Sequence, residues 1–144
     1  MTPTKTALSA ATLLLGAAGC VQPPDLTAVR AERDKAVQRS DNFQAAAGNG
    51  QQLVSAGRGG VLVTSGDGGR HWQREQLPLP ASVVAMSACP DGRFAALDFY
   101  RKVWIGDAQA TNWTPRPIEG DFNPVDIECD PQNRLWVVAA IRRC

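Results

Sequence analysis

Short apolar runs separated by turn residues occupy most of the chain after residue 42. Runs of this length with interspersed polar positions are typical of β-strands. Gly, Pro, Asn and Asp cluster between them, as in Gly48-Asn49-Gly50 and Pro90-Asp91-Gly92, and these residue types favour tight turns. The expected strands cover residues 43–47, 51–56, 60–64, 71–77, 82–88, 93–99, 102–105, 112–117, 124–128 and 134–141. The pattern therefore predicts an all-β fold.

The predicted strands repeat at a fixed interval. Trp72 and Trp113 are 41 residues apart, and Leu53, Phe94 and Leu135 follow one another at the same spacing. A period of roughly 40 to 50 residues with four strands per unit is the size of a β-propeller blade. We expect an incomplete propeller over residues 41–144, with blades at 41–80 and 81–120 and an incomplete one at 121–144. This amounts to about two and a half four-stranded blades.

The first unit carries a specific hairpin motif. Ser65, Asp67, Gly69 and Trp72 fill the pattern S-x-D-x-G-x-x-W of an Asp-box. The aspartate can accept hydrogen bonds from nearby backbone amides, and Gly66, Gly68 and Gly69 allow positive φ. The tryptophan supplies a large apolar surface that can pack over the turn. We interpret the motif as structural rather than catalytic.

The matching turn of the second unit has lost most of this motif. Gly106, Ala108 and Ala110 stand where the serine, aspartate and glycine are expected, and Asp107 is one position out of register. Only Trp113 keeps its place. The sequence therefore predicts a decayed Asp-box in this unit.

Residues 41–45 (Asp-Asn-Phe-Gln-Ala) and 59–63 (Gly-Gly-Val-Leu-Val), taken with the Asp-box, resemble bacterial relatives of the photosystem II stability and assembly factor. These are BNR-repeat propellers, and the resemblance extends from about residue 40 onward; the fold it implies is one that serves many roles. It implies a propeller that assists photosystem assembly through a basic surface. That role transfers poorly, because the arginines are spread over both full blades: Arg58, Arg70, Arg74, Arg93, Arg101 and Arg116.

The same resemblance raises a question of completeness. Family members close a ring, and closed propellers have roughly four to eight blades. A sheet with an open edge invites pairing with another chain. We therefore expect either a truncated copy or a chain that completes a ring by self-association through its open edge.

The N-terminus has the architecture of a bacterial lipoprotein signal. Lys5 precedes an apolar stretch at 7–15, and Ala17-Ala18-Gly19-Cys20 resembles a lipobox with Ala where Leu is usual. We expect residues 1–19 to be a signal peptide and Cys20 to carry the lipid, palmitate included. An ordinary secretory signal is the alternative. No Asp follows the cysteine, which favours the periplasmic side of the outer membrane over the inner membrane.

Residues 20–40 are expected to form a lipidated tether. A short helix at 25–37, capped by Asp25, is compatible with the sequence, but its apolar stripe is thin. A solvated spacer is preferred to a partner-docking helix because the charges are balanced.

Composition narrows the function further. The 144 residues carry a net charge of +1, and no run of basic residues forms the concentrated face that nucleic-acid binding needs. No metal site or cofactor is expected, because the chain has no C-x-x-C motif and His71 is its sole histidine. His71 is interpreted as an exposed hairpin residue.

Four cysteines fit an exported protein. With Cys20 assigned to the lipid, Cys89 and Cys129 precede equivalent turns one repeat apart, so a disulfide between neighbouring blades is one interpretation. Buried free thiols are the other. Cys144 is left without an assigned partner.

Asp-boxes also occur in sialidases, which need an arginine cluster, a tyrosine nucleophile with a carboxylate partner, and an acid. Tyr100 is the sole tyrosine, and Glu75, Glu119 and Glu128 are scattered. We therefore expect a non-catalytic, lipid-anchored module of the bacterial cell envelope that binds an unidentified envelope protein, in the manner of an assembly factor. The alternatives are a fragment of a sialidase-like glycoside hydrolase or carbohydrate-binding protein, and a non-functional remnant.

Overall fold

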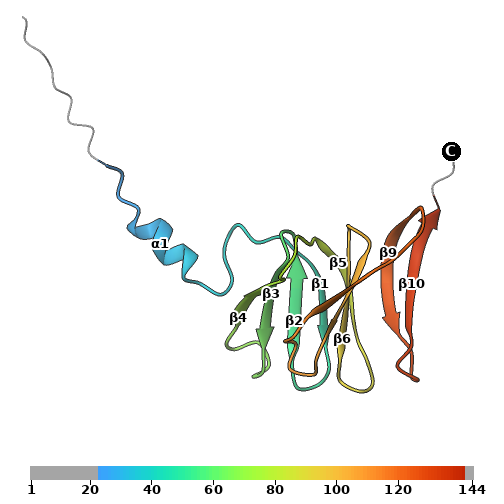
Figure 1. Cartoon of the computed structure of the whole chain (residues 1–144). Helices are drawn as coiled ribbons and strands as arrows, with labels where there is room; N and C mark the ends of the chain where they lie inside the picture. The colour runs from blue at the N-terminus through green and yellow to red at the C-terminus, as the bar shows by residue number, and fades with distance from the viewer. Residues whose placement is uncertain (1–22, 142–144) are drawn as a thin grey trace, which may run out of the picture.

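The computed structural model describes residues 23–141, so the expected signal peptide, Cys20 and Cys144 lie outside the described residues. The described part contains a short helix, α1 (Thr27–Arg33), followed by strands only (Figure 1). The strands are β1 (Phe43–Gly48), β2 (Leu53–Gly57), β3 (Val61–Ser65), β4 (Gln73–Gln76), β5 (Val83–Ala88), β6 (Phe94–Asp98), β7 (Lys102–Gly106), β8 (Thr114–Pro117), β9 (Phe122–Cys129) and β10 (Leu135–Ile141).

These strands form three antiparallel sheets that stand side by side (Figure 1). Two are complete meanders of four strands, β1-β2-β3-β4 and β5-β6-β7-β8, and the third is the pair β9-β10. The first strand of each sheet, β1, β5 and β9, lies next to the first strand of the neighbouring sheet. The expectation of an all-β, incomplete propeller is therefore confirmed, with the sheets as its blades.

The first hydrophobic core fills the space between blades 1 and 2. Val54 and Leu62 from blade 1 meet Phe94 and Trp104 from blade 2, and all four are completely buried. Burying a large apolar side chain contributes about 1.5 to 3 kcal/mol. This interface is therefore the main source of stability for the first two blades.

A second, smaller core lies between blades 2 and 3. Ala95, Leu97 and Val103 on the opposite face of blade 2 pack with Ile127 of β9, which is 1% exposed. Alternate residues of β6 thus face the two neighbouring blades, as the two-residue periodicity of a strand requires. All five residues of β6 are buried in consequence.

The N-terminal segment lies against the outer side of blade 1. Arg74 on β4 donates two hydrogen bonds to the carboxylate of Asp41, at 2.7 and 2.8 Å, and a third to the carbonyl of Ala36 at 3.0 Å. These bonds hold the pKa of Asp41 below its usual value. The segment that precedes β1 is thus fastened to the face of blade 1 that has no neighbouring blade within the described residues.

The helix differs from the sequence-based expectation. It covers Thr27–Arg33 rather than 25–37, its N-cap is Leu26, and no side chain caps it. Asp25 instead accepts hydrogen bonds from the backbone N–H and hydroxyl of Thr27, because it lies one position too early to reach the amides of the first turn. No residue of the helix is buried, which agrees with the preferred interpretation as a spacer.

Candidate functional site

The Asp-box forms the turn between β3 and β4, where Asp67 organises the backbone. Its Oδ1 accepts hydrogen bonds from the N–H groups of Arg70 and His71, both at 2.9 Å, and from the hydroxyl of Ser65 at 2.9 Å. The Ser65 hydroxyl oxygen accepts in turn from the N–H of Gly69 at 2.8 Å. These bonds, led by that of the His71 N–H, lower the pKa of Asp67 well below its ordinary value. The carboxylate is fully occupied as a turn former.

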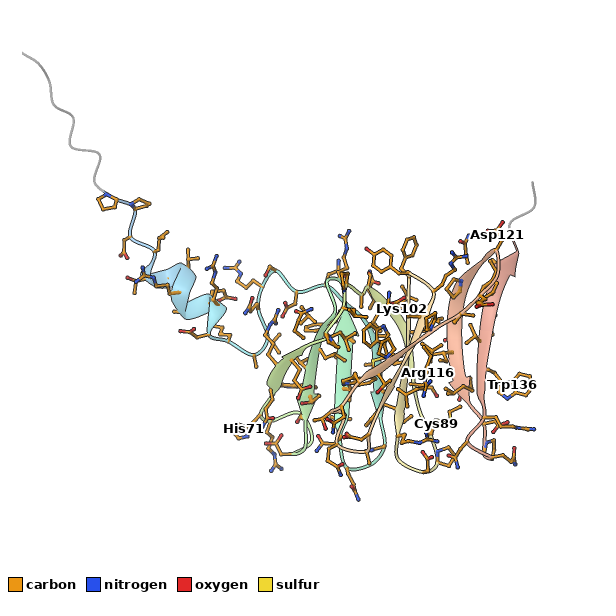
Figure 2. All side chains as sticks on the ribbon, viewed as in Figure 1. His71, Cys89, Lys102, Arg116, Asp121 and Trp136 are labelled. Carbon is orange, nitrogen blue, oxygen red and sulfur yellow. A yellow bond between two sulfur atoms is a disulfide. The ribbon has the colours of Figure 1, made fainter. Side chains whose placement is uncertain are left out.

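Trp72 and the glycines complete this turn. Gly68 and Gly69 adopt φ of +75° and +90°, and a Cβ on Gly69 would lie 3.5 Å from the indole of Trp72. Gly66 does not adopt a positive φ, contrary to expectation, because the next two glycines make the left-handed bend. The side chain of His71 is 89% exposed at the tip of the hairpin (Figure 2).

Blade 2 keeps the hydrogen-bonding scheme with different residues. Asp107 accepts bonds from the N–H of Thr111 at 2.8 Å, from its hydroxyl at 2.7 Å, and from the side chain of Asn112 at 2.7 Å. Ala110 adopts φ of +61° at the glycine position, and its carbonyl accepts the indole N–H of Trp113. The motif is therefore lost in sequence but its geometry persists, since an aspartate one position away still reaches the same amides.

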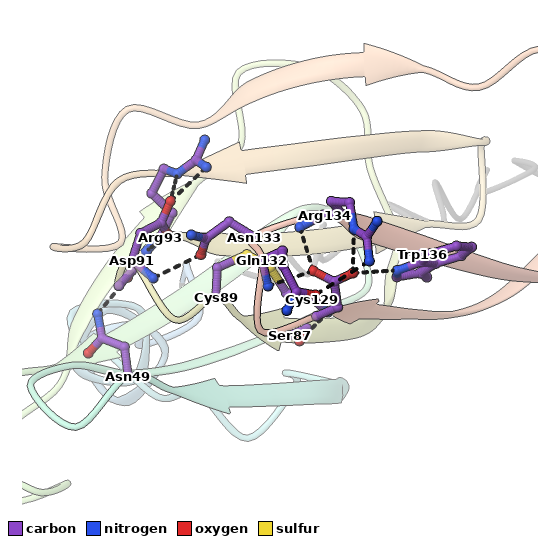
Figure 3. The surroundings of a disulfide bond; sticks show 12 residues. Asn49, Ser87, Cys89, Asp91, Arg93, Cys129, Gln132, Asn133, Arg134 and Trp136 are labelled. Atoms are coloured by element: carbon purple, nitrogen blue, oxygen red, sulfur yellow. Dashed lines mark hydrogen bonds and ion pairs between the residues drawn. A yellow bond between two sulfur atoms is a disulfide. The ribbon is translucent and has the colours of Figure 1, made fainter.

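A disulfide joins blades 2 and 3. Cys89 follows β5 and Cys129 ends β9, and their Cα atoms are 5.1 Å apart (Figure 3). The Cys129 N–H donates to the Ser87 hydroxyl at 3.1 Å, and the Asp91 N–H donates to the side-chain oxygen of Asn133 at 3.0 Å. This is the pair that the repeat spacing singled out, and it fastens the half blade to its neighbour.

A groove of about 1010 Å³ opens at the opposite end of the propeller from the Asp-box hairpin. Three connections meet there, the β2–β3 turn, the β4–β5 connection and the β6–β7 turn, at the upper end of the blades in Figure 1. Pro78, Leu79 and Pro80 form one wall, and Phe99 and Tyr100 form another. We call this the upper groove.

The aromatic wall is exposed and ordered. Phe99 and Tyr100 are 69% and 57% exposed, and their rings meet edge to face with centroids 5.9 Å apart. The Phe99 N–H donates to the carbonyl of Ser82 at 2.8 Å, and the ammonium of Lys102 lies 5.1 Å from the Tyr100 ring centroid. Two adjacent aromatic rings on a fixed turn present apolar surface to a ligand at little cost in conformational entropy.

The polar groups of the upper groove are cationic or neutral. The side chain of Arg58 is exposed, and within residues 23–141 its guanidinium has no hydrogen-bond or ion-pair partner. Asn42 and Gln44 contribute side-chain amides, and none of the described lining residues is acidic. The groove thus combines apolar walls with one free positive charge.

The residues considered for glycosidase chemistry are not brought together. Within the described part of the chain, the Tyr100 hydroxyl bonds to no carboxylate, and the nearest charged group recorded against its ring is Lys102. Glu75 lines a polar hollow beside Asp67, Glu119 lies between β8 and β9, and Glu128 is on β9. No constellation of a tyrosine nucleophile with a partner carboxylate is formed by these residues.

Two further searches cover the same residues. No group of three His, Cys, Asp or Glu side chains in residues 23–141 could hold a metal ion. No helix in this range is long and apolar enough to span a bilayer.

No protein-family model matches the chain, and no curated protein matches it either. Among solved structures, it is similar to one described as "YCF48 bound to D1 peptide", with a TM-score of 0.54 and 18% sequence identity. The similarity covers 67% of this chain and 33% of that chain, so the present sequence spans about a third of its neighbour's length. At this level of identity the similarity concerns the fold, which is propeller-like in both proteins.

Proposed function

We propose that this protein is a non-catalytic interaction module of the bacterial cell envelope, and that its upper groove binds an extended peptide segment of a partner protein. The single observation that carries the proposal is the free guanidinium of Arg58 in a groove walled by exposed Phe99 and Tyr100. Exposed aromatic side chains and arginine are enriched where proteins bind one another.

The chemistry of the groove defines the peptide. A carboxylate of the ligand would pair with Arg58, whose planar guanidinium can donate two parallel hydrogen bonds. An aliphatic or aromatic side chain would lie between Leu79 and the rings of Phe99 and Tyr100. The amides of Asn42 and Gln44 can bond the peptide backbone, which gives affinity without sequence preference.

The groove is also preorganised. Pro78 and Pro80 fix their own φ, and the backbone N–H of Arg58 donates to the Asn42 carbonyl at 3.1 Å. A binding surface that is already ordered loses less entropy when the ligand arrives. The solved neighbour, described as bound to a D1 peptide, supports peptide binding by a propeller of this kind. Its ligand is not assigned to this chain.

The location belongs to the same proposal. A lipid on Cys20 would hold the propeller at the periplasmic side of a membrane, the outer one by preference, and residues 21–42 would link the lipid to blade 1. In this arrangement the module acts on envelope proteins during their assembly.

Site-specific photo-crosslinking in cells tests the proposal. A photoreactive residue at position 100 should give a discrete adduct with a partner protein, and Arg58→Glu should abolish it. The matched control carries the photoreactive residue at position 71, which is equally accessible but lies at the other end of the blades. The same adducts from both positions, or an adduct that survives Arg58→Glu, would refute binding in the upper groove.

A further inference from the structure

The outer edge of β10 is unpaired within residues 23–141. In blades 1 and 2 the second strand pairs on its outer side with a third, through four residue pairs in each blade: Leu53–Ala56 with Leu62–Ser65, and Phe94–Leu97 with Val103–Gly106. Both of these pairings are antiparallel. β10 is the second strand of its blade, but its sheet contains β9 and β10 alone. Its outer backbone groups therefore remain available for another strand.

The outward face of β10 has the composition of an interface. Val54, Ala95 and Trp136 occupy the same repeat position, 41 residues apart, and the first two are completely buried against the next blade. Trp136, which projects from β10 away from the other blades, is 57% exposed (Figure 2). Val138, at the position of Leu97, is 58% exposed where Leu97 is completely buried. This strand thus carries apolar residues that a following sheet covers elsewhere in the molecule.

The sequence of β10 lacks the devices that protect an edge strand. Residues 135–141 read Leu-Trp-Val-Val-Ala-Ala-Ile, without a charged residue or proline. Edge strands of soluble proteins usually carry a lysine, a proline or a bulge that discourages pairing. The bulge recorded in this sheet is on the β9 side, at Val125, because Val138 and Ala139 pair with Asp126 and Pro124. The edge is therefore open to a strand of matching length.

We propose that β10 pairs with β10 of a second copy of this chain, forming one sheet in the order β9-β10-β10-β9. A two-fold axis perpendicular to a sheet always makes the two central strands antiparallel, which is the sense that blades 1 and 2 use at this edge. The joint sheet has four strands, as each complete blade has. The half blade is thus completed between copies.

Full overlap of the two strands fixes the register. Val138, the middle residue of β10, then lies opposite its own symmetry mate, and Trp136 lies opposite Ala140 on the same face. A large ring over a small side chain is a favourable cross-strand neighbour. Arg134, which precedes the strand, is already paired with Asp130 at 2.7 Å and adds no uncompensated charge near the interface.

Mass measurement of two lysine variants tests the pairing. The full chain would be purified in the detergent that extracts it, with Cys144→Ser present throughout so that no disulfide at that position can join two copies. Light scattering should give twice the 15.4 kDa chain mass. Val138→Lys should raise the dimer dissociation constant at least tenfold, because two like charges would lie directly opposite each other. Val125→Lys is the control, since Val125 is equally exposed but lies on β9.

The outcomes separate the alternatives. A dimer that Val138→Lys dissociates and Val125→Lys leaves intact supports strand pairing. A monomeric parent chain overturns it, as does dissociation by both lysines, which indicates that the faces stack instead. If Val138→Lys does not fold, hydrogen exchange on the parent chain decides the question. Amides of β10 should exchange more slowly as protein concentration rises, and exchange that is independent of concentration contradicts the proposal.

Discussion

The indole nitrogen of Trp104 lies 2.9 Å from Oδ2 of Asp98, and both side chains are completely buried. The same carboxylate accepts the ammonium of Lys102 at 3.0 Å and, through Oδ1, the backbone N–H of Lys102 at 2.9 Å. These bonds close the turn that carries Phe99 and Tyr100. A buried charge at the end of β6 therefore holds the aromatic wall of the upper groove in place.

Replacement of this carboxylate should destabilise the fold. Asp98→Ala leaves the indole N–H and the Lys102 ammonium without their acceptor in a buried site, which typically costs about 3 to 5 kcal/mol. Asp98→Asn retains one acceptor and should cost less. Urea unfolding followed by tryptophan fluorescence measures both variants. A loss below about 1 kcal/mol for Asp98→Ala would mean that the turn is held by other contacts.

The disulfide should stabilise the third blade. Cys89 and Cys129 are 40 residues apart, and the chain-entropy estimate for a loop of this length is about 4 kcal/mol. Reduction, or the double change Cys89→Ser with Cys129→Ser, should lower the melting temperature. Adding reductant to the double variant should change nothing further. A melting temperature unaffected by reduction of the parent chain would contradict a structural role for this bond.

Acid should weaken the Asp-box hairpin. Hydrogen bonds lower the pKa of Asp67 in the folded state, so its contribution to stability is present above the unfolded value of about 3.9 and is lost as the pH falls further. Asp67→Asn should therefore be less stable than the parent at pH 7, and the gap should narrow below pH ~4. Thermal melts of both proteins across this range provide the measurement. A gap that stays constant into strong acid would exclude this linkage.

The ion pair of Asp41 with Arg74 should protect the tether from proteolysis. Asp41→Ala removes both charge-assisted hydrogen bonds that fasten residues 36–41 to β4, so trypsin should cleave at Lys35 or Arg39 several times faster. The exchanged pair, Asp41→Arg with Arg74→Asp, should recover part of the protection. Equal cleavage rates for the parent and Asp41→Ala would show that the segment is held by its other contacts.

The sequence was sufficient to predict the blades, because turn residues and apolar runs recur at one spacing and each strand is determined locally. The Cys89–Cys129 pair was open to prediction for the same reason, since equivalent turns of neighbouring blades lie side by side. The geometry retained at Asp107 was missed, although an aspartate beside the expected position was a usable signal. An exact pattern match overlooks such a shift, whereas the backbone tolerates it.

The upper groove could not be predicted from the sequence. Its walls come from three connections that are distant in the chain, and nothing local distinguishes an exposed Phe99 from a buried Phe94. The arginines illustrate the same limit. Arg74 is consumed by Asp41 and Arg58 is free, and only the three-dimensional arrangement separates a structural arginine from one available to a ligand.

Peptide affinity tests the central claim most directly. A random peptide library displayed on phage would be selected on the purified chain, and the best peptide measured by calorimetry against the parent, Arg58→Glu and Arg70→Glu. Arg70 is the matched control because it is an exposed arginine at the Asp-box end of the blades. We predict peptides that combine a carboxylate with a bulky apolar residue, an affinity at least tenfold lower for Arg58→Glu, and no change for Arg70→Glu. Failure to select any peptide, or equal affinity for all three proteins, would contradict the claim that the upper groove is a binding site.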